Sequence, residues 1–144
     1  ARKSVFDPNI GGCAACHGTE TFVAPGLRNN GLQLNYSDQG AGGVSGLGRD
    51  NALFKSPSLK SIALTAPYMH DGRFKTLEEV VEHYNSGVQP HPNLSPPLRL
   101  PGPGPIQVKR LNLTTSDKAA LVAFLKTLTD ESLLTDERFA DPFS

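Results

Sequence analysis

Two cysteines and a histidine near the start of the sequence constrain this chain more than any other feature. They lie in the segment CAACH at residues 13–17, which has the spacing C-x-x-C-H. This spacing is the attachment signature of c-type haem, in which two thiols form thioethers with one porphyrin and the adjacent histidine binds the iron. We therefore expect one covalent haem c on Cys13 and Cys16, with His17 as the proximal iron ligand.

Two other kinds of site use a C-x-x-C pair, and both fit less well. A thioredoxin-like dithiol is typical of a βαβ context, whereas this segment lies in a glycine-rich stretch. A structural zinc site needs four ligands at short spacings, and Cys13 and Cys16 are the only cysteines in the chain. Haem c is the preferred interpretation, and it leaves no cysteine for a disulfide elsewhere.

The composition indicates a small, loop-rich domain built round an apolar cofactor. Only 38% of the 144 residues are hydrophobic, and the chain has 14 glycines and 12 prolines. A haem would supply apolar core that the side chains do not. We expect a single domain over residues 1–144, with residues 130–144 as a carboxyl-terminal arm that lies against the body or against a second copy of the chain in a homodimer.

Charge and hydropathy exclude some partners and suggest a compartment. Positive and negative side chains number 14 each, so the net charge of zero gives no field for nucleic acid. No run reaches the roughly 18 apolar residues of a membrane-spanning helix, and no signal peptide is visible. Because haem c is normally attached after export, we expect a processed segment located in the bacterial periplasm.

A capping box predicts a helix in the middle of the chain. Thr76 is followed three residues later by Glu79, the pattern in which each residue bonds the other's backbone N–H. Gly87 is expected to end this helix in a left-handed conformation. Its apolar face, at helical spacing, comprises Leu77, Val80, Val81 and Tyr84.

Two further helices are predicted on either side. A second capping box, Thr114 with Asp117, opens the last helix. Its apolar stripe comprises Ala120, Leu121, Phe124, Leu125 and Leu128. A shorter helix is expected from Ser56 to Pro67, because serine is a good N-cap and proline suits the first helical position.

The remaining segments are predicted to be irregular. Residues 2–6 could form a short amino-terminal helix, and residues 18–49 form a loop over one edge of the haem. Residues 88–112 hold seven of the twelve prolines and either shield the haem, form a partner surface or simply connect two helices. No strand pattern extends beyond short fragments, so the fold class is all-α with long Gly/Pro-rich loops.

The residue on the other side of the iron determines the redox behaviour, and the sequence leaves it open. A methionine ligand raises the potential, and Met69 is the only methionine; its alternative role is to fill a gap in the core. A phenolate stabilises ferric iron, and Tyr84 is either that ligand or an ordinary core tyrosine. His83, His70 and His91 are weaker candidates for this ligand. His83 should point away from the apolar face. His70 is expected to bond a loop or a haem propionate, and His91, between two prolines, is expected to be exposed.

Three longer segments carry a more specific signal. Residues 54–74, 76–87 and 121–128 resemble the bacterial di-haem cytochrome c peroxidase and MauG family. The likeness runs from Cys13 to about Thr129 and corresponds to the family's C-terminal haem domain. It implies a cytochrome c-like helical fold wrapped round one haem that receives electrons.

The resemblance also implies site residues. In the peroxidases the distal ligand is a methionine, which by ungapped count falls at Tyr84, and MauG-type members have a tyrosine there. Tyr84 is therefore the preferred distal ligand and Met69 the alternative. The family binds calcium between its haem domains, and the backbone oxygens of Thr65 and Pro67 match part of that site.

The chain departs from the family in having one C-x-x-C-H rather than two. Its expected function is an electron-transfer domain of a di-haem peroxidase or MauG-like oxidoreductase, which uses a redox partner protein or a second haem domain and hydrogen peroxide as substrate. The alternatives are an autonomous single-haem peroxidase and a soluble single-haem carrier without an enzymatic step. The sequence leaves open whether the chain alone is an enzyme.

Overall fold

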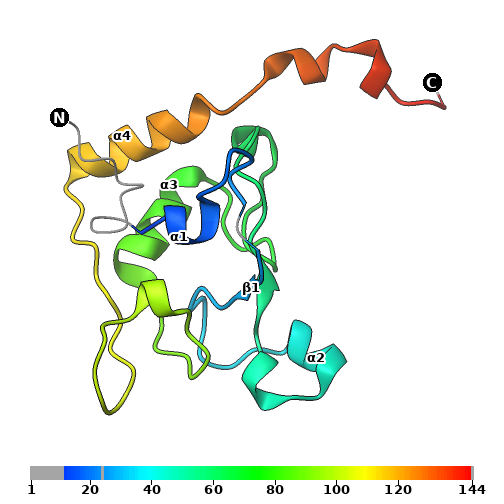
Figure 1. Ribbon diagram of the computed structural model, residues 1–144. Coiled ribbons are helices and arrows are strands. Elements are labelled where there is room, and N and C mark those ends of the chain that lie inside the picture. The colour runs from blue at the N-terminus through cyan, green and yellow to red at the C-terminus, as the bar shows by residue number, and fades with distance from the viewer. Residues whose placement is uncertain (1–11, 24, 144) are drawn as a thin grey trace.

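Short helices and long connecting segments make up the structure, a computed structural model that describes residues 12–23 and 25–143. The predicted helix at residues 2–6 lies outside these ranges. The α-helices are α1 (Ala14–His17), α2 (Ala41–Ser45), α3 (Leu77–Glu82) and α4 (Thr115–Lys126). Two strands, β1 (Leu27–Arg28) and β2 (Phe54–Lys55), complete the elements labelled in the figures (Figure 1).

Single turns of other helical types connect these elements. A π-helical turn, His83–Gly87, continues α3. Turns of 3-10 helix occupy Gly48–Asp50, Ile62–Leu64, Pro96–Leu98, Glu131–Leu134 and Glu137–Phe139. The two strands pair antiparallel, Leu27 with Lys55 and Arg28 with Phe54. The all-α prediction is therefore not confirmed: the longer elements are helical, but the fold also contains this small antiparallel ladder.

Helix α3 begins as its capping box predicts and ends differently. The Thr76 hydroxyl accepts the Glu79 N–H at 3.2 Å, and the Glu79 carboxylate accepts the Thr76 N–H at 2.9 Å. The prediction that Gly87 adopts a left-handed conformation is wrong, because Gly87 is the last residue of the π-helical turn and has no positive φ. The wider turn carries the chain from α3 into the following segment without a left-handed residue at Gly87.

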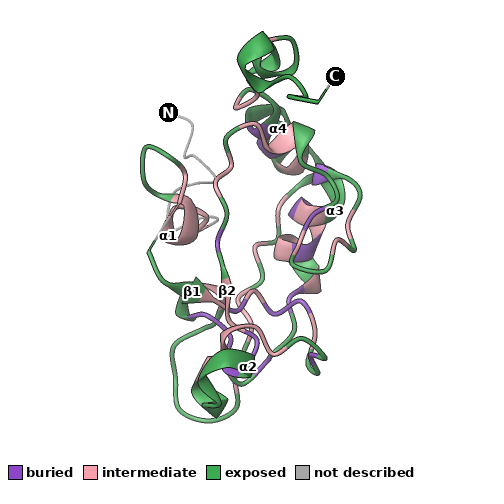
Figure 2. Cartoon of the chain, turned by 90° about the vertical axis from the view of Figure 1, so that its right-hand side faces the viewer, coloured by how far each residue is buried: buried purple, intermediate pink, exposed green. Residues whose placement is uncertain are grey.

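Helix α4 packs against α3 and forms the main core with it. The Thr114 box is confirmed, with its hydroxyl 3.2 Å from the Asp117 nitrogen. The buried residues of this core are Tyr68, Leu77, Val81, Leu121, Val122 and Leu125. The predicted stripe is partly wrong, because Ala120 and Phe124 are exposed. Buried residues on α3 and α4 are visible on the facing sides of these helices in Figure 2.

The helix predicted from Ser56 to Pro67 is wrong apart from the turn Ile62–Leu64. The Ser58 hydroxyl accepts the Lys60 N–H at 3.1 Å, which satisfies that donor outside a helix. Ser61 has a left-handed φ of 54°, which interrupts helical geometry. Its N–H bonds the Leu128 carbonyl at 2.7 Å instead. A contact with the end of α4 has replaced local helical hydrogen bonds.

The first part of the segment 88–112 packs into the domain, whereas residues 99–105 are exposed. Val88 and Leu94 are only 1% exposed. Backbone bonds join this segment to residues 29–31, with Gln89 N 2.7 Å from Gly31 O and Ser95 N 3.1 Å from Asn29 O. Residues 18–49, predicted as loop alone, also contain β1 and α2.

The carboxyl-terminal arm leads away from the rest of the domain. Residues 130–143, orange to red in Figure 1, continue beyond α4 as two 3-10 turns. Large apolar side chains on this arm are exposed: Leu133, Leu134, Phe139 and Phe143. The arm therefore does not fold back over the α3–α4 core.

Candidate haem site

The C-x-x-C-H segment folds as a single turn that presents both thiols and the imidazole. Cys13 precedes α1, and its carbonyl accepts the N–H groups of Cys16 at 3.1 Å and His17 at 2.9 Å. Residue 18, directly after the turn, must be glycine in this conformation, because a Cβ there would lie 2.3 Å from the Ala14 oxygen. Both thiols are free.

His17 is held in the tautomer that leaves Nε2 available. Its Nδ1 lies 3.0 Å from the Phe22 carbonyl oxygen, and because a carbonyl only accepts, Nδ1 carries the proton. Burial lowers the pKa of His17, although backbone bonds with Phe22 and Pro57 oppose that shift. A neutral imidazole oriented through its second nitrogen is the form that binds metals.

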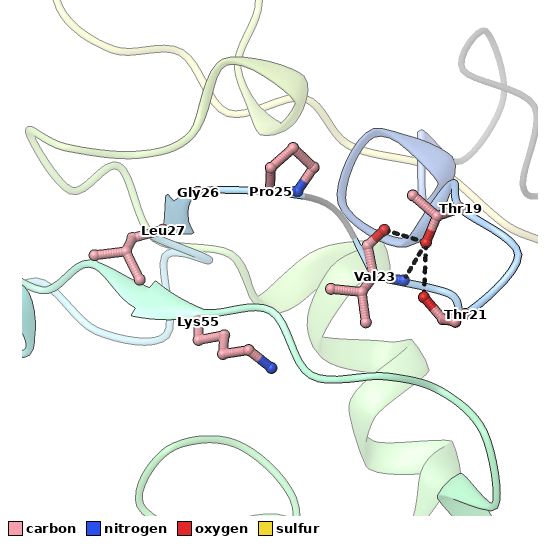
Figure 3. Close-up of a pocket in the computed structure, with 7 residues that line it drawn as sticks. All are labelled: Thr19, Thr21, Val23, Pro25, Gly26, Leu27 and Lys55. Carbon is pink, nitrogen blue, oxygen red and sulfur yellow. Dashed lines mark hydrogen bonds between the residues drawn. The ribbon is translucent and has the colours of Figure 1, made fainter.

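A network on Thr19 stabilises the loop that supplies this carbonyl. The Thr19 hydroxyl donates to the Val23 oxygen at 2.6 Å and accepts the Val23 N–H at 3.1 Å (Figure 3). A pocket of about 440 Å³ adjoins the loop; its lining residues are Thr19, Thr21, Val23, Pro25, Gly26, Leu27 and Lys55. None of the predicted iron or thioether ligands lines this pocket, which is separate from the donor set.

The Cys13 thiol is unlike that of a redox-active dithiol. Burial raises the pKa of Cys13 to about 11, while its own backbone hydrogen bond lowers it, the Cys16 charge raises it and the Lys109 charge lowers it. A catalytic dithiol has a thiol with a lowered pKa. The environment of Cys13 therefore argues against the thioredoxin-like alternative.

Tyr84, on the π-helical turn after α3, shares an environment with the two thiols. Burial raises the pKa of Tyr84 to about 12, and a hydrogen bond with the Asn30 side chain opposes this. The charges of Cys16 and Cys13 raise it further, which they can do only from nearby. The fold thus brings Tyr84, the preferred distal residue, toward the C-x-x-C-H turn 67 residues earlier in the sequence.

Met69, the alternative distal residue, is held by the same asparagine. Asn30 Nδ2 donates to the Met69 sulfur at 3.2 Å. The Met69 side chain also packs against a small cluster of Leu32, Tyr36 and Ala52. Sequence reasoning missed Asn30, because no local pattern marks a residue whose partners lie 39 and more positions away.

His83 is also bound to this asparagine, contrary to prediction. It was expected to point away from the apolar face of the helix, but it is 6% exposed and its Nε2 lies 3.1 Å from the Asn30 carbonyl oxygen. Its ring meets that of Tyr84 edge to face at 5.1 Å. The prediction is wrong because residues 29–31 cover this side of the helix.

Comparisons with known proteins decide the family. No protein-family model matches the chain. The chain is 34% identical over 122 residues to the methylamine utilization protein MauG of Methylorubrum extorquens. The aligned region covers 83% of this chain and 31% of that protein. It is 41% identical over 101 residues to cytochrome-c peroxidase IdrP2 of a Pseudomonas species, covering 70% of the chain and 24% of the relative.

A solved structure gives the same answer. The chain matches a MauG-like protein associated with microbial copper homeostasis with a TM-score of 0.80 and 33% identity, over 97% of this chain and 49% of that one. The chain belongs to the MauG and di-haem cytochrome c peroxidase family. It spans less than a third of each of the two curated relatives described above.

The two remaining histidines of this MauG-family domain lie apart from the Asn30 contacts. His70 is exposed and stacks on Phe54, with ring centroids 4.0 Å apart. The prediction that His91 is exposed is wrong: it is 8% exposed, and its Nδ1 accepts the Asn93 N–H at 3.0 Å. The Tyr36 ring, which meets His91 edge to face at 5.2 Å, and the buried side chain of Asn29 cover His91 despite its flanking prolines.

The predicted calcium ligands lie on an exposed loop of the domain. Thr65 and Pro67 are both exposed, and the Thr65 hydroxyl donates to the Ile62 carbonyl at 3.1 Å. Over the part of the chain that the structure describes, no three His, Cys, Asp or Glu side chains gather as a metal site. A calcium site formed by backbone oxygens stays a prediction.

One finding concerns the membrane. Within residues 12–23 and 25–143, no helix combines the length and the apolar character needed to cross a bilayer.

Proposed function

We propose that this chain is the haem c electron-transfer domain of a di-haem peroxidase or MauG-like oxidoreductase. Cys13 and Cys16 hold one haem covalently, His17 binds the iron from the proximal side, and Tyr84 binds it from the distal side, with Met69 as the alternative. The chain corresponds to the C-terminal haem domain of its relatives. In the complete protein it exchanges electrons with a second haem domain or a redox partner protein.

The observation that carries this proposal is the state of the donor groups. Two free thiols and an imidazole share one turn, and the Phe22 carbonyl holds the proton of His17 on Nδ1. Tyr84 lies close enough to both cysteines for their charges to affect its pKa. The donor types and their grouping therefore fit the haem that the family implies. Bound haem would supply one-electron redox chemistry at its iron.

The expected iron ligands, His17 and Tyr84, determine which oxidation state of the iron is favoured. His17 stays neutral and oriented because Nδ1–H donates to a backbone oxygen. Tyr84 offers an oxygen ligand, which favours the ferric state and a low potential. If His17 and Tyr84 both held the iron, no coordination position would be left for peroxide. Electron transfer is therefore favoured over peroxide reduction by this domain alone.

The proposal also covers the substrate, the cellular location, calcium and the neighbouring domain. The complete oxidoreductase uses hydrogen peroxide and lies in the bacterial periplasm, where haem c is attached. Calcium binds between the haem domains through the Thr65 and Pro67 backbone oxygens. The second haem domain is the preferred neighbour, and a homodimer is the alternative.

Covalent attachment is tested by expressing the chain together with a haem c maturation system. We expect a coloured protein whose mass exceeds that of the polypeptide by one haem, and a Cys13→Ala/Cys16→Ala variant that retains no covalent haem. A colourless wild-type chain of polypeptide mass contradicts the proposal.

The distal ligand and the alternative functions have separate readouts on the same sample. Tyr84→Phe should change the ferric absorption spectrum, and Met69→Leu should leave it unchanged. Steady-state turnover of hydrogen peroxide by the isolated holoprotein would favour the autonomous peroxidase instead, whereas electron exchange without turnover supports the electron-transfer domain.

A further inference from the structure

Asn30 binds one candidate distal ligand directly and acts on the other. Its Nδ2 donates to the Met69 sulfur at 3.2 Å, and its side chain lowers the pKa of Tyr84, against the effect of burial. Its backbone oxygen lies 3.1 Å from Nε2 of His83, the residue next to Tyr84. A single residue therefore connects Met69, Tyr84 and the start of the π-helical turn.

The backbone on either side of Asn30 is rigidly held. Asn29 is fully buried, and its side chain donates to the Ala52 oxygen at 2.9 Å and accepts the Gly31 N–H at 2.8 Å. Gly31 has a φ of 64°, and a Cβ there would lie 2.6 Å from the Gln89 oxygen. The direction of the Asn30 side chain is thus set by its neighbours rather than by solvent.

A hydrogen bond from the Asn30 amide has a different effect on a thioether sulfur and on a tyrosine oxygen. A primary amide has two N–H donors, so it can donate to a sulfur and an oxygen together. A thioether sulfur that accepts a hydrogen bond is directed toward the donor, and its freedom to reach a metal is reduced. A tyrosine oxygen bound to iron carries negative charge and keeps further lone pairs, so an N–H donor stabilises it in place.

We propose that Asn30 determines which side chain binds the iron, by holding the Met69 sulfur away from the metal and by orienting the Tyr84 oxygen toward it. This inference rests on the proposed function, because both side chains are ligands only if haem is present. Asn30 is a positioning residue and touches no reacting atom itself.

The test uses the holoprotein and compares wild type with Asn30→Leu and Asn30→Asp. Leucine removes both donors, and aspartate keeps the shape of asparagine while its carboxylate accepts only. The readouts are the weak near-infrared sulfur-to-iron band of ferric haem and the midpoint potential. We expect no such band in wild type. In both variants we expect the band to appear and the potential to rise, because methionine favours ferrous iron.

A matched control assigns the new band. The double variant Asn30→Leu/Met69→Leu should lose the band and return to a lower potential. Far-UV circular dichroism and haem content identify a variant that has failed to fold, and Asn30→Asp, the smaller change, then carries the test. If folded Asn30 variants keep the wild-type spectrum and potential, the inference is overturned.

Failure of the inference and failure of the proposed function are distinguishable. Tyr84→Phe with an unchanged ferric spectrum removes Tyr84 as the ligand, whatever the Asn30 variants show. Tyr84→Phe with a changed spectrum, together with unchanged Asn30 variants, leaves the proposed ligand in place and removes the role of Asn30.

Discussion

Single buried residues join the loops of this domain through their hydrogen bonds. Asn29 is the clearest case, because its side chain is fully buried and bonds backbone groups on both sides of it. Its own N–H donates to the Ser95 hydroxyl at 3.0 Å. A fully buried amide with satisfied partners stabilises its surroundings, and its removal leaves those partners without a bond.

We expect Asn29→Ala to lower the free energy of unfolding by about 3 kcal/mol, because the Ala52 carbonyl and the Gly31 N–H both lose a partner inside the protein. Chemical denaturation with urea measures the difference. Asn35→Ala, at an exposed site, is the matched control and should change stability by less than about 0.5 kcal/mol. Equal effects of the two substitutions would contradict this role for Asn29.

The proximal half of the candidate site could be predicted from the sequence, whereas the distal half could be predicted only in part. Cys13, Cys16 and His17 lie within one turn, so their spacing alone determines their grouping. Asn30, His83 and His91 take their positions from contacts with distant segments. No local periodicity reports such contacts, which explains why His83 and His91 were misplaced and Asn30 was not recognised.

At the scale of elements, the starts of α3 and α4 were predictable, whereas the end of α3 was not. A capping box is a contact between residues three apart, so the sequence at 76–79 and 114–117 contains all its participants. The segment after Ser56 has equally good local signals for a helix. It follows another path because Ser61 bonds the end of α4, a contact that only the folded chain supplies.

The box of α4 can be tested with adjacent threonines. Thr114→Ala removes the hydroxyl that accepts the Asp117 N–H and should lower the free energy of unfolding by about 1 kcal/mol. Thr115→Ala changes the first helical residue, which is exposed and makes no capping bond in this box, and should have a much smaller effect. Thermal unfolding of both variants gives the comparison; a larger loss for Thr115→Ala would refute the assignment of the cap.

At the scale of the whole molecule, the two sides of the candidate site come from opposite sides of the domain. Figure 2 shows α1 on one side and α3 with α4 on the other, above the β1–β2 ladder. The proximal residues lie on or next to α1 and Tyr84 follows α3, so correct placement of the haem ligands depends on the complete fold. Residues 88–112 contribute by packing against residues 29–31.

The arm at residues 130–143 contributes little to this fold. Its first residue, Asp130, is joined to the body through its N–H, which lies 3.4 Å from the Ser61 hydroxyl, and the large apolar side chains beyond it are exposed. We expect removal of residues 131–144 to leave the melting temperature of the holoprotein within a few degrees of wild type, because large shifts require the loss of buried contacts. Calorimetry measures this. A loss of cooperative unfolding would show instead that the arm is part of the core.

The bond between His17 and the Phe22 carbonyl has a consequence for redesign. Since the acceptor is a main-chain atom, no change of the residue 22 side chain deletes it. A change in the length of the loop 18–23 would alter this hydrogen bond and with it the electron-donating strength of the imidazole. The voltage at which the domain operates could be adjusted in this way without touching either ligand.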